Sequence, residues 1–146
     1  MRSSDTCELT FEDCYVSDAQ RVGEVGRGFI DTLQILDRGR ISIGALALGL
    51  GEGSLDAAVA YAKDRKQFGK AIAEFQAVQW MIADSKTELE AAKLLVYRAA
   101  IEADRSDRYS LEASMAKLYA SEAATRACNR ALQVHGGYGY TREFPV

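Results

Sequence analysis

Histidine and proline occur once each in this 146-residue sequence, and cysteine occurs three times, as Cys7, Cys14 and Cys128. A single histidine, His135, and cysteines without CxxC spacing cannot supply the ligands of a usual zinc site, so no metal is predicted. Cysteines with no even framework are typical of a reducing compartment, where they act as packing residues. The near absence of proline, in a chain rich in Ala, Leu, Glu and Lys, permits long helices.

The sequence also lacks an excess of positive charge and a long hydrophobic run. The formal net charge is −3 and the pI is about 5.2, so no basic stripe is available to neutralise phosphates, and we expect no nucleic-acid partner. The longest apolar run, residues 41–50 with its glycines, is half the length that spans a bilayer, and no signal peptide is visible at Met1. We expect no membrane partner. The length and apolar content suit a single domain with one core.

Residues 5–16 alternate in type, with Cys7, Leu9 and Phe11 on one side and polar residues on the other. This period of two predicts a half-buried β-strand. No second strand of similar quality follows. Because a lone strand cannot satisfy its backbone hydrogen bonds, we expect it to pair with something outside this chain.

Three long helical segments are predicted after a glycine-bearing connection over residues 17–28. The first covers about residues 29–65, the second 73–104 and the third 110–134, and their short connections predict an all-α, up-down antiparallel bundle. The first segment contains small residues that indicate the close approach of another helix. These are Ala45, Gly49 and Gly53 at spacing four, with Gly44, Ala47, Gly51 and Ala57 close by.

The second and third segments each carry a seam of residues spaced alternately by three and four, as in a coiled coil. The seam of the third segment is small and partly polar, which favours tight packing. The second seam comprises Phe75, Val78, Ile82, Ser85, Leu89, Ala92, Val96 and Ala99, and the third comprises Leu111, Ser114, Leu118, Ser121, Thr125, Cys128 and Leu132.

Asp37 and Arg40 lie three residues apart on one face of the first helix, which leaves two interpretations. One is an intrahelical ion pair, worth about 0.2–0.5 kcal/mol. The other is a polar clamp on a ligand that enters beside the bundle.

Arg65, Phe68 and Gln76 surround a helix break in which Gly69 is expected to be the C-cap glycine. An arginine at a helix C-terminus is favoured by the helix dipole, so a capping role is one interpretation. The alternative is a phosphate-binding guanidinium beside an aromatic ring.

Residues 133–143, QVHGGYGYTRE, place three glycines within four positions after a helix. Exposed backbone N–H groups there would cradle an anion. A simple C-cap followed by a loop is the alternative. No strand precedes the glycines, so the segment is not a Rossmann fingerprint.

Four motifs together resemble the acyl-CoA dehydrogenase family in order and spacing: LxFEDxxV at 9–16, LDRGR at 36–40, DRKQFGKAIAEFQA at 64–77 and LQVHGGYGYTREFPV at 132–146. The resemblance covers essentially the whole chain. It implies that residues 1–22 are the tail strand of a middle β-domain with its linker. Residues 23–146 would then be the C-terminal helical domain, with three of its four helices, ending before the last one.

The resemblance also implies roles for individual residues. Arg65 would bind the FAD pyrophosphate across a subunit interface, Phe68 would pack beside the cofactor, and Gln76 would contact its adenosine half. Further FAD contacts would come from Gln133, Gly136 and Gly137, which match positions that hold the ADP portion of a neighbouring subunit's FAD. The acyl-CoA pocket would be lined by Leu36, Asp37 and Arg40.

No catalytic residue is assigned, because the family's base does not match any glutamate of this chain. In most members the base follows the motif at 132–146, and in two branches it occupies the position that matches Gly39. Glu52 and Glu74 are interpreted as surface charges. The resemblance thus implies part of an enzyme that oxidises the Cα–Cβ bond of an acyl-CoA, with FAD as hydride acceptor and without its base.

The expected partners are an acyl-CoA substrate, electron-transfer flavoprotein and further copies of the chain in a dimer or tetramer. The expected location is the bacterial cytoplasm or the mitochondrial matrix. Two further interpretations stay open: a noncatalytic helical oligomerisation module of the same ancestry, and a flavin-dependent oxidase or monooxygenase of the same family.

Overall fold

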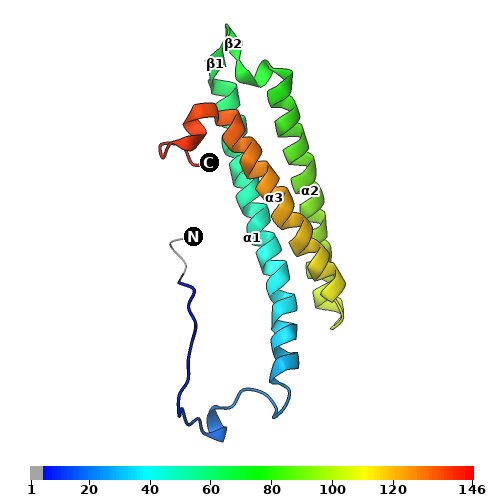
Figure 1. Ribbon diagram of the computed structural model, residues 1–146. Coiled ribbons are helices and arrows are strands. Elements are labelled where there is room, and N and C mark those ends of the chain that lie inside the picture. Colours follow the sequence, from blue (N-terminus) through cyan, green and yellow to red (C-terminus); the bar gives the residue numbers. More distant parts are fainter. Residues whose placement is uncertain (1–4) are drawn as a thin grey trace.

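The computed structural model describes residues 5–146, and its long helices form an up-down antiparallel bundle (Figure 1). α1 spans Gly28–Asp64, α2 spans Gln76–Arg105 and α3 spans Ser110–His135. Each of these three helices begins and ends within three residues of the position predicted from the sequence. The predicted all-α bundle is therefore confirmed.

Short elements complete the described chain. A two-stranded antiparallel hairpin, which the sequence did not predict, follows α1, and a 3₁₀-helix lies before each of α1 and α2 and after α3. The strands are β1 (Lys66–Gln67) and β2 (Lys70–Ala71), and the 3₁₀-helices are η1 (Asp18–Gln20), η2 (Ile72–Glu74) and η3 (Gly136–Tyr140).

The strand expected over residues 5–16 is not formed within the described residues. This segment makes no ladder and leaves Leu9 and Phe11 exposed. A strand needs a neighbouring edge to supply its hydrogen bonds, and the two-residue strands of the hairpin pair only with each other. Cys7 and Cys14, expected to be packing residues, are exposed as well.

Glycines let α1 approach the other two helices, and they are Gly44 and Gly51 of the predicted small residues, not the members at spacing four. Gly44 and Gly51 are buried, with Ala116 and Ala124 of α3 close to their backbone. Gly49 and Gly53 have open space where a Cβ would stand. The two buried glycines are seven residues apart, close to two full helical turns, so they lie on the same face of α1. Residues repeated every four positions move progressively around the helix and leave the contact face.

The seam predicted for α2 is confirmed, and the seam predicted for α3 is wrong. Ser85, Leu89 and Val96 of α2 are buried. In α3, Leu111 and Leu118 are exposed, and the buried face is made almost entirely of alanines, which let the backbones approach closely. These alanines are Ala113, Ala116, Ala120, Ala123, Ala124, Ala127 and Ala131.

Gly51→Ala is expected to lower the free energy of unfolding by about 1–2 kcal/mol, since the cost of overpacking exceeds the gain in helix propensity. The added methyl would lie 2.6 Å from Leu89 Cδ2 and 3.2 Å from Ala124 Cα. Gly49→Ala is the matched control, expected to stabilise the chain by about 0.5–1 kcal/mol. Urea denaturation followed by circular dichroism measures both, and equal effects would contradict this packing.

Charged side chains join α2 to α3 beside the core. Glu88 accepts hydrogen bonds from Arg126 Nε at 2.9 Å and from both terminal nitrogens of Arg130 at 3.2 Å. Partial burial raises the pKa of the Glu88 carboxyl, but these hydrogen bonds outweigh it, so that its pKa lies below the usual value. The network adds charged side-chain contacts between α2 and α3 to those of the core.

By length and mean hydropathy alone, α1 would be able to cross a bilayer, with a value of 1.3 over its most apolar window. A packed helix of a bundle can meet the same two criteria, and 28% of this window is buried within the described structure. In this bundle α1 packs along α3, and Leu48 and Leu55 are buried in the core.

Candidate functional site

The connection from α1 to α2 positions Arg65. Its backbone caps α1, with the Arg65 N–H donating to Tyr61 O at 2.8 Å, and then turns into the extended conformation of the hairpin. Phe68 and Gly69 form the two-residue turn, with φ of 55° and 82°. Such turns need positive φ at both positions. Gly69 is therefore a hairpin residue, and the prediction that it is the C-cap glycine of α1 is wrong.

The glycine segment after α3 is an ordered bend. Gly136 ends the helix with φ 60°, and its N–H donates to Gln133 O. This bond supports the C-cap interpretation and withdraws that N–H from any ligand. Gly136 and Gly137 nevertheless leave the backbone open, since nothing lies within 4 Å of where their Cβ atoms would stand. Gly139 is buried, with its missing Cβ 2.6 Å from Leu132 O, which holds the bend against α3.

The structure brings Arg65 and the glycine bend together at one end of the bundle. They line an open cavity of about 440 Å³ between the end of α1 and the end of α3. Two motifs that lie about seventy residues apart in the sequence therefore share one site. The lining residues are Tyr61, Arg65, Gln67, Ile72, Val134, His135, Gly136, Gly137, Tyr138 and Thr141.

An aromatic cluster supports this cavity. The Tyr61 and His135 rings stack with centroids 4.3 Å apart, and Phe144 lies edge-on to both at 5.6 Å. His135 is buried, and its Nδ1 is 2.8 Å from Ala131 O. The sequence prediction missed these residues. Tyr61 precedes Arg65 by one helical turn, a spacing that would have placed both on one face.

The Arg65 guanidinium contacts an aromatic ring, and no carboxylate of the described residues pairs with it. Its Cζ lies 5.4 Å from the centroid of the Tyr138 ring, within the range of a cation–π contact. Within residues 5–146, no ion pair involves the Arg65 guanidinium. Its charge is therefore not neutralised by the part of the chain that the structure describes.

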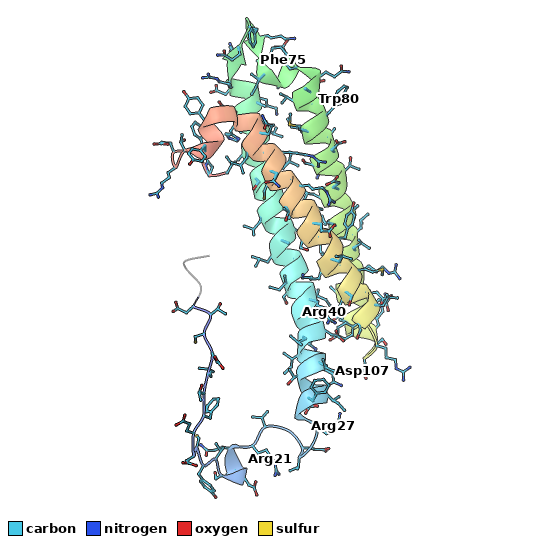
Figure 2. The ribbon with its side chains drawn as sticks, viewed as in Figure 1. Arg21, Arg27, Arg40, Phe75, Trp80 and Asp107 are labelled. Carbon is cyan, nitrogen blue, oxygen red and sulfur yellow. The ribbon has the colours of Figure 1, made fainter. Side chains whose placement is uncertain are left out.

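The other predicted cofactor residues lie around this end of the bundle but outside the cavity. Gln133 lines a second hollow, of about 470 Å³, which shares Gly136 and Gly137 with the first. Phe68 is 92% exposed at the tip of the hairpin, with its ring edge-on to Phe75. Gln76 begins α2 next to Phe75, which Figure 2 shows at the hairpin end of the bundle.

The predicted substrate residues lie far from Arg65, on the half of α1 nearest its N-terminus (Figure 2, Arg40). At 1.5 Å per residue, Arg40 and Arg65 are about 37 Å apart along the helix. Arg40 donates to Asp37, as the ion-pair interpretation predicts, and the Ser110 hydroxyl donates to the same carboxylate. Asp37 thus ties α1 to the start of α3. Leu36 is half-exposed beside it.

Gly39 lies on the same stretch of α1, with nothing within 4 Å of its absent Cβ. Of the two glutamates interpreted as surface charges, Glu74 is exposed and Glu52 pairs with Lys93 at 3.3 Å.

The antiparallel helices place the chain in the class of helical-bundle domains, with a cation and an open glycine bend at one end. A comparison with known families is more specific: the family model described as "Acyl-CoA dehydrogenase, C-terminal domain" matches residues 26–146. The chain belongs to the acyl-CoA dehydrogenase family, whose members are flavoprotein oxidoreductases.

Individual relatives agree with this family. The chain is 50% identical over 141 residues to subunit CarC of the caffeyl-CoA reductase–Etf complex of Acetobacterium woodii, covering 97% of this chain and 37% of the relative. It is 49% identical over 146 residues to a probable acyl-CoA dehydrogenase of Bacillus subtilis, covering 100% of this chain and 38% of the relative.

Among solved structures, butyryl-CoA dehydrogenase from Megasphaera elsdenii matches with a TM-score of 0.83 at 44% identity, covering 84% of this chain and 32% of that one. The chain thus spans less than two-fifths of the length of these relatives.

Proposed function

We propose that this chain is the C-terminal helical part of an acyl-CoA dehydrogenase that converts an acyl-CoA thioester to its trans-2-enoyl-CoA. FAD, when bound, supplies the hydride acceptor for this oxidation of the Cα–Cβ bond. Membership of the family supports the proposal, as do relatives of more than twice the chain's length. In this assignment residues 1–22 belong to a preceding β-domain and residues 23–146 to the helical domain.

The observation that carries the proposal is the meeting of Arg65 with the glycine bend in one cavity. α1 and α3 both end here, and helix C-termini carry partial negative charge. Attraction for an anion must therefore come from side chains, and Arg65 supplies a charge that is free of carboxylates in the described chain. The bend supplies open backbone, so that a diphosphate can approach closely. These features fit the diphosphate of FAD.

The remaining contacts would extend from this point along the dinucleotide. Gln133 borders the second hollow and would bind the ADP portion, Gln76 at the start of α2 would contact the adenosine half, and the exposed Phe68 ring would pack beside the cofactor. Because this FAD would belong to an adjoining subunit, the site is complete only in an oligomer.

Substrate contacts would lie toward the other end of α1. Asp37 and Arg40 would make polar contacts with the CoA moiety beside Leu36, and the ion pair between them would keep both side chains oriented. Removal of the α-proton requires a carboxylate within hydrogen-bond reach. Gly39 has no side chain to offer, so the base would come from a residue outside this chain. On its own the chain would be inactive.

Partners follow from the same proposal. Large exposed apolar side chains on all three helices, such as Leu50, Trp80 and Leu118, support assembly into a dimer or tetramer. Electron-transfer flavoprotein is the proposed electron acceptor, supported by the Etf complex of the Acetobacterium woodii relative. The proposed location is the bacterial cytoplasm or the mitochondrial matrix.

Arg65→Ala in the complete polypeptide that carries this chain is expected to weaken FAD binding about 10- to 100-fold, the effect of losing a charged hydrogen bond to the diphosphate. Fluorescence titration of the apoprotein with FAD measures the dissociation constant. Arg108→Ala, an exposed arginine near the opposite end of the bundle, is the control and should leave FAD affinity unchanged.

Unaltered FAD affinity in Arg65→Ala would contradict the assignment of the diphosphate to this cavity. An oligomer that forms normally yet binds no FAD in its unaltered form would favour the noncatalytic oligomerisation module.

A further inference from the structure

Tyr138 occupies a place that the cofactor assignment leaves unexplained. Its ring lies under the Arg65 guanidinium, 5.4 Å from Cζ to the centroid, at the wall of the cavity. It is 45% exposed, so its contribution to the hydrophobic core is small. Tyr138 nevertheless belongs to the glycine bend after α3, and its contact with Arg65 links this bend to the end of α1.

The Tyr138 ring is itself fixed from behind. Its centroid lies 5.2 Å from that of Phe144, and Phe144 contacts both rings of the stacked Tyr61–His135 pair. His135 is in turn anchored to Ala131 O. This succession of contacts supports an aromatic face beside an arginine side chain that has no carboxylate partner within residues 5–146.

An aromatic face suits a cation that must still bind an anion. A carboxylate in this position would orient Arg65 but would also neutralise it and compete with a phosphate for its N–H groups. A ring attracts the guanidinium through its quadrupole and leaves the edge N–H groups free to donate. The arginine can thus be ordered before the ligand arrives, which reduces the entropy lost on binding.

We propose that Tyr138 is a positioning residue that holds the Arg65 guanidinium in the cavity beside Gly136 and Gly137, ready for a dinucleotide diphosphate. The inference rests on the proposed function, because it takes Arg65 as the diphosphate ligand. Tyr138 acts through Arg65, and the aromatic face rather than the hydroxyl is what the arginine needs. Phenylalanine therefore serves equally well at this position.

The test uses FAD titrations of the complete polypeptide that carries this chain, as the unaltered protein and as the variants Tyr138→Phe, Tyr138→Leu, Arg65→Ala and the double variant Arg65→Ala/Tyr138→Leu. Leucine keeps an apolar contact with Phe144 and removes the π face. Tyr97→Leu, an exposed tyrosine on α2, is the control for loss of a surface ring. Circular dichroism and thermal melting verify that each variant is folded.

Tyr138→Leu is expected to weaken FAD binding about three- to tenfold, in line with a cation–π contact. Tyr138→Phe restores affinity to within about twofold of the unaltered protein, and Tyr138→Leu has no further effect once Arg65 is alanine, because the positioning has nothing left to act on. A purely structural role would lower affinity equally in both backgrounds.

Three results would overturn the inference: unchanged affinity in Tyr138→Leu, an equal loss in Tyr138→Phe, or additive losses in the double variant. If Tyr138→Leu does not fold, failure of Tyr138→Phe to match the unaltered affinity decides against it. Failure of the proposed function is distinguishable, since it would appear as unchanged FAD affinity in Arg65→Ala itself.

Discussion

The 146-residue chain on its own, supplied with excess FAD and an acyl-CoA, is expected to reduce an electron-accepting dye no faster than a protein-free blank. Transfer of hydride from Cβ needs removal of the α-proton, and positioned general bases contribute roughly 10²–10⁴-fold to such steps. In the proposed assignment, residue 39, a glycine in this chain, would stand at one of the two positions of the family's base, and the base would come from a residue outside the chain. The FAD site is, in addition, shared between subunits in the proposed assignment.

Saturating FAD is part of this assay so that a lost cofactor cannot mimic a missing base, and a complete acyl-CoA dehydrogenase serves as the positive control. Dye reduction by the chain above the blank, dependent on acyl-CoA, would contradict the assignment of the base to a residue outside it. Carboxylate-to-amide variants such as Glu52→Gln would then identify the base.

Leu89→Ala is expected to lower the free energy of unfolding by about 2–5 kcal/mol, the range for truncating a buried leucine. Leu89 is 1% exposed, where α2 meets Gly51 of α1 in the bundle core. α1 makes far fewer contacts with α2 than it makes with α3. The Leu89 side chain is therefore central to the packing of α2 on α1. Chemical denaturation and thermal melting of the variant measure the loss.

Leu94→Ala is the matched control for Leu89→Ala. It removes the same atoms from the same helix, but Leu94 is 67% exposed, so the expected change is within about 0.5 kcal/mol. Destabilisation of similar size in both variants would contradict the helical face assigned to the core.

The sequence predicted the bundle well because long amphipathic segments are set by local periodicity. In α2, large apolar residues such as Leu89 and Val96 mark the buried face. In α3 the prediction followed Leu111 and Leu118, although the alanines of the opposite face are buried. Alanine is only weakly hydrophobic, so it does not mark a buried face in the sequence. In α3 its small side chain allows close approach to α1, and this contact cannot be recognised from the sequence of one helix alone.

The candidate site was predicted in part. Arg65 and the bend at Gly136 were singled out from their residue types, and the structure places them in one cavity. The contact of Arg65 with Tyr138 and the support from Phe144 depend on how the chain folds back after α3, which no local pattern encodes. The strand predicted over residues 5–16 was expected to pair with something outside this chain, and the described residues supply no edge for it.

The central claim is that Arg65 and the Gly136–Gly137 bend together receive the diphosphate of an adjoining subunit's FAD. A crystal structure of the complete polypeptide with FAD bound tests this most directly. The account predicts the Arg65 guanidinium within hydrogen-bond distance of the diphosphate oxygens and the open backbone of the bend packed against the dinucleotide. A structure in which both lie remote from the cofactor would contradict it.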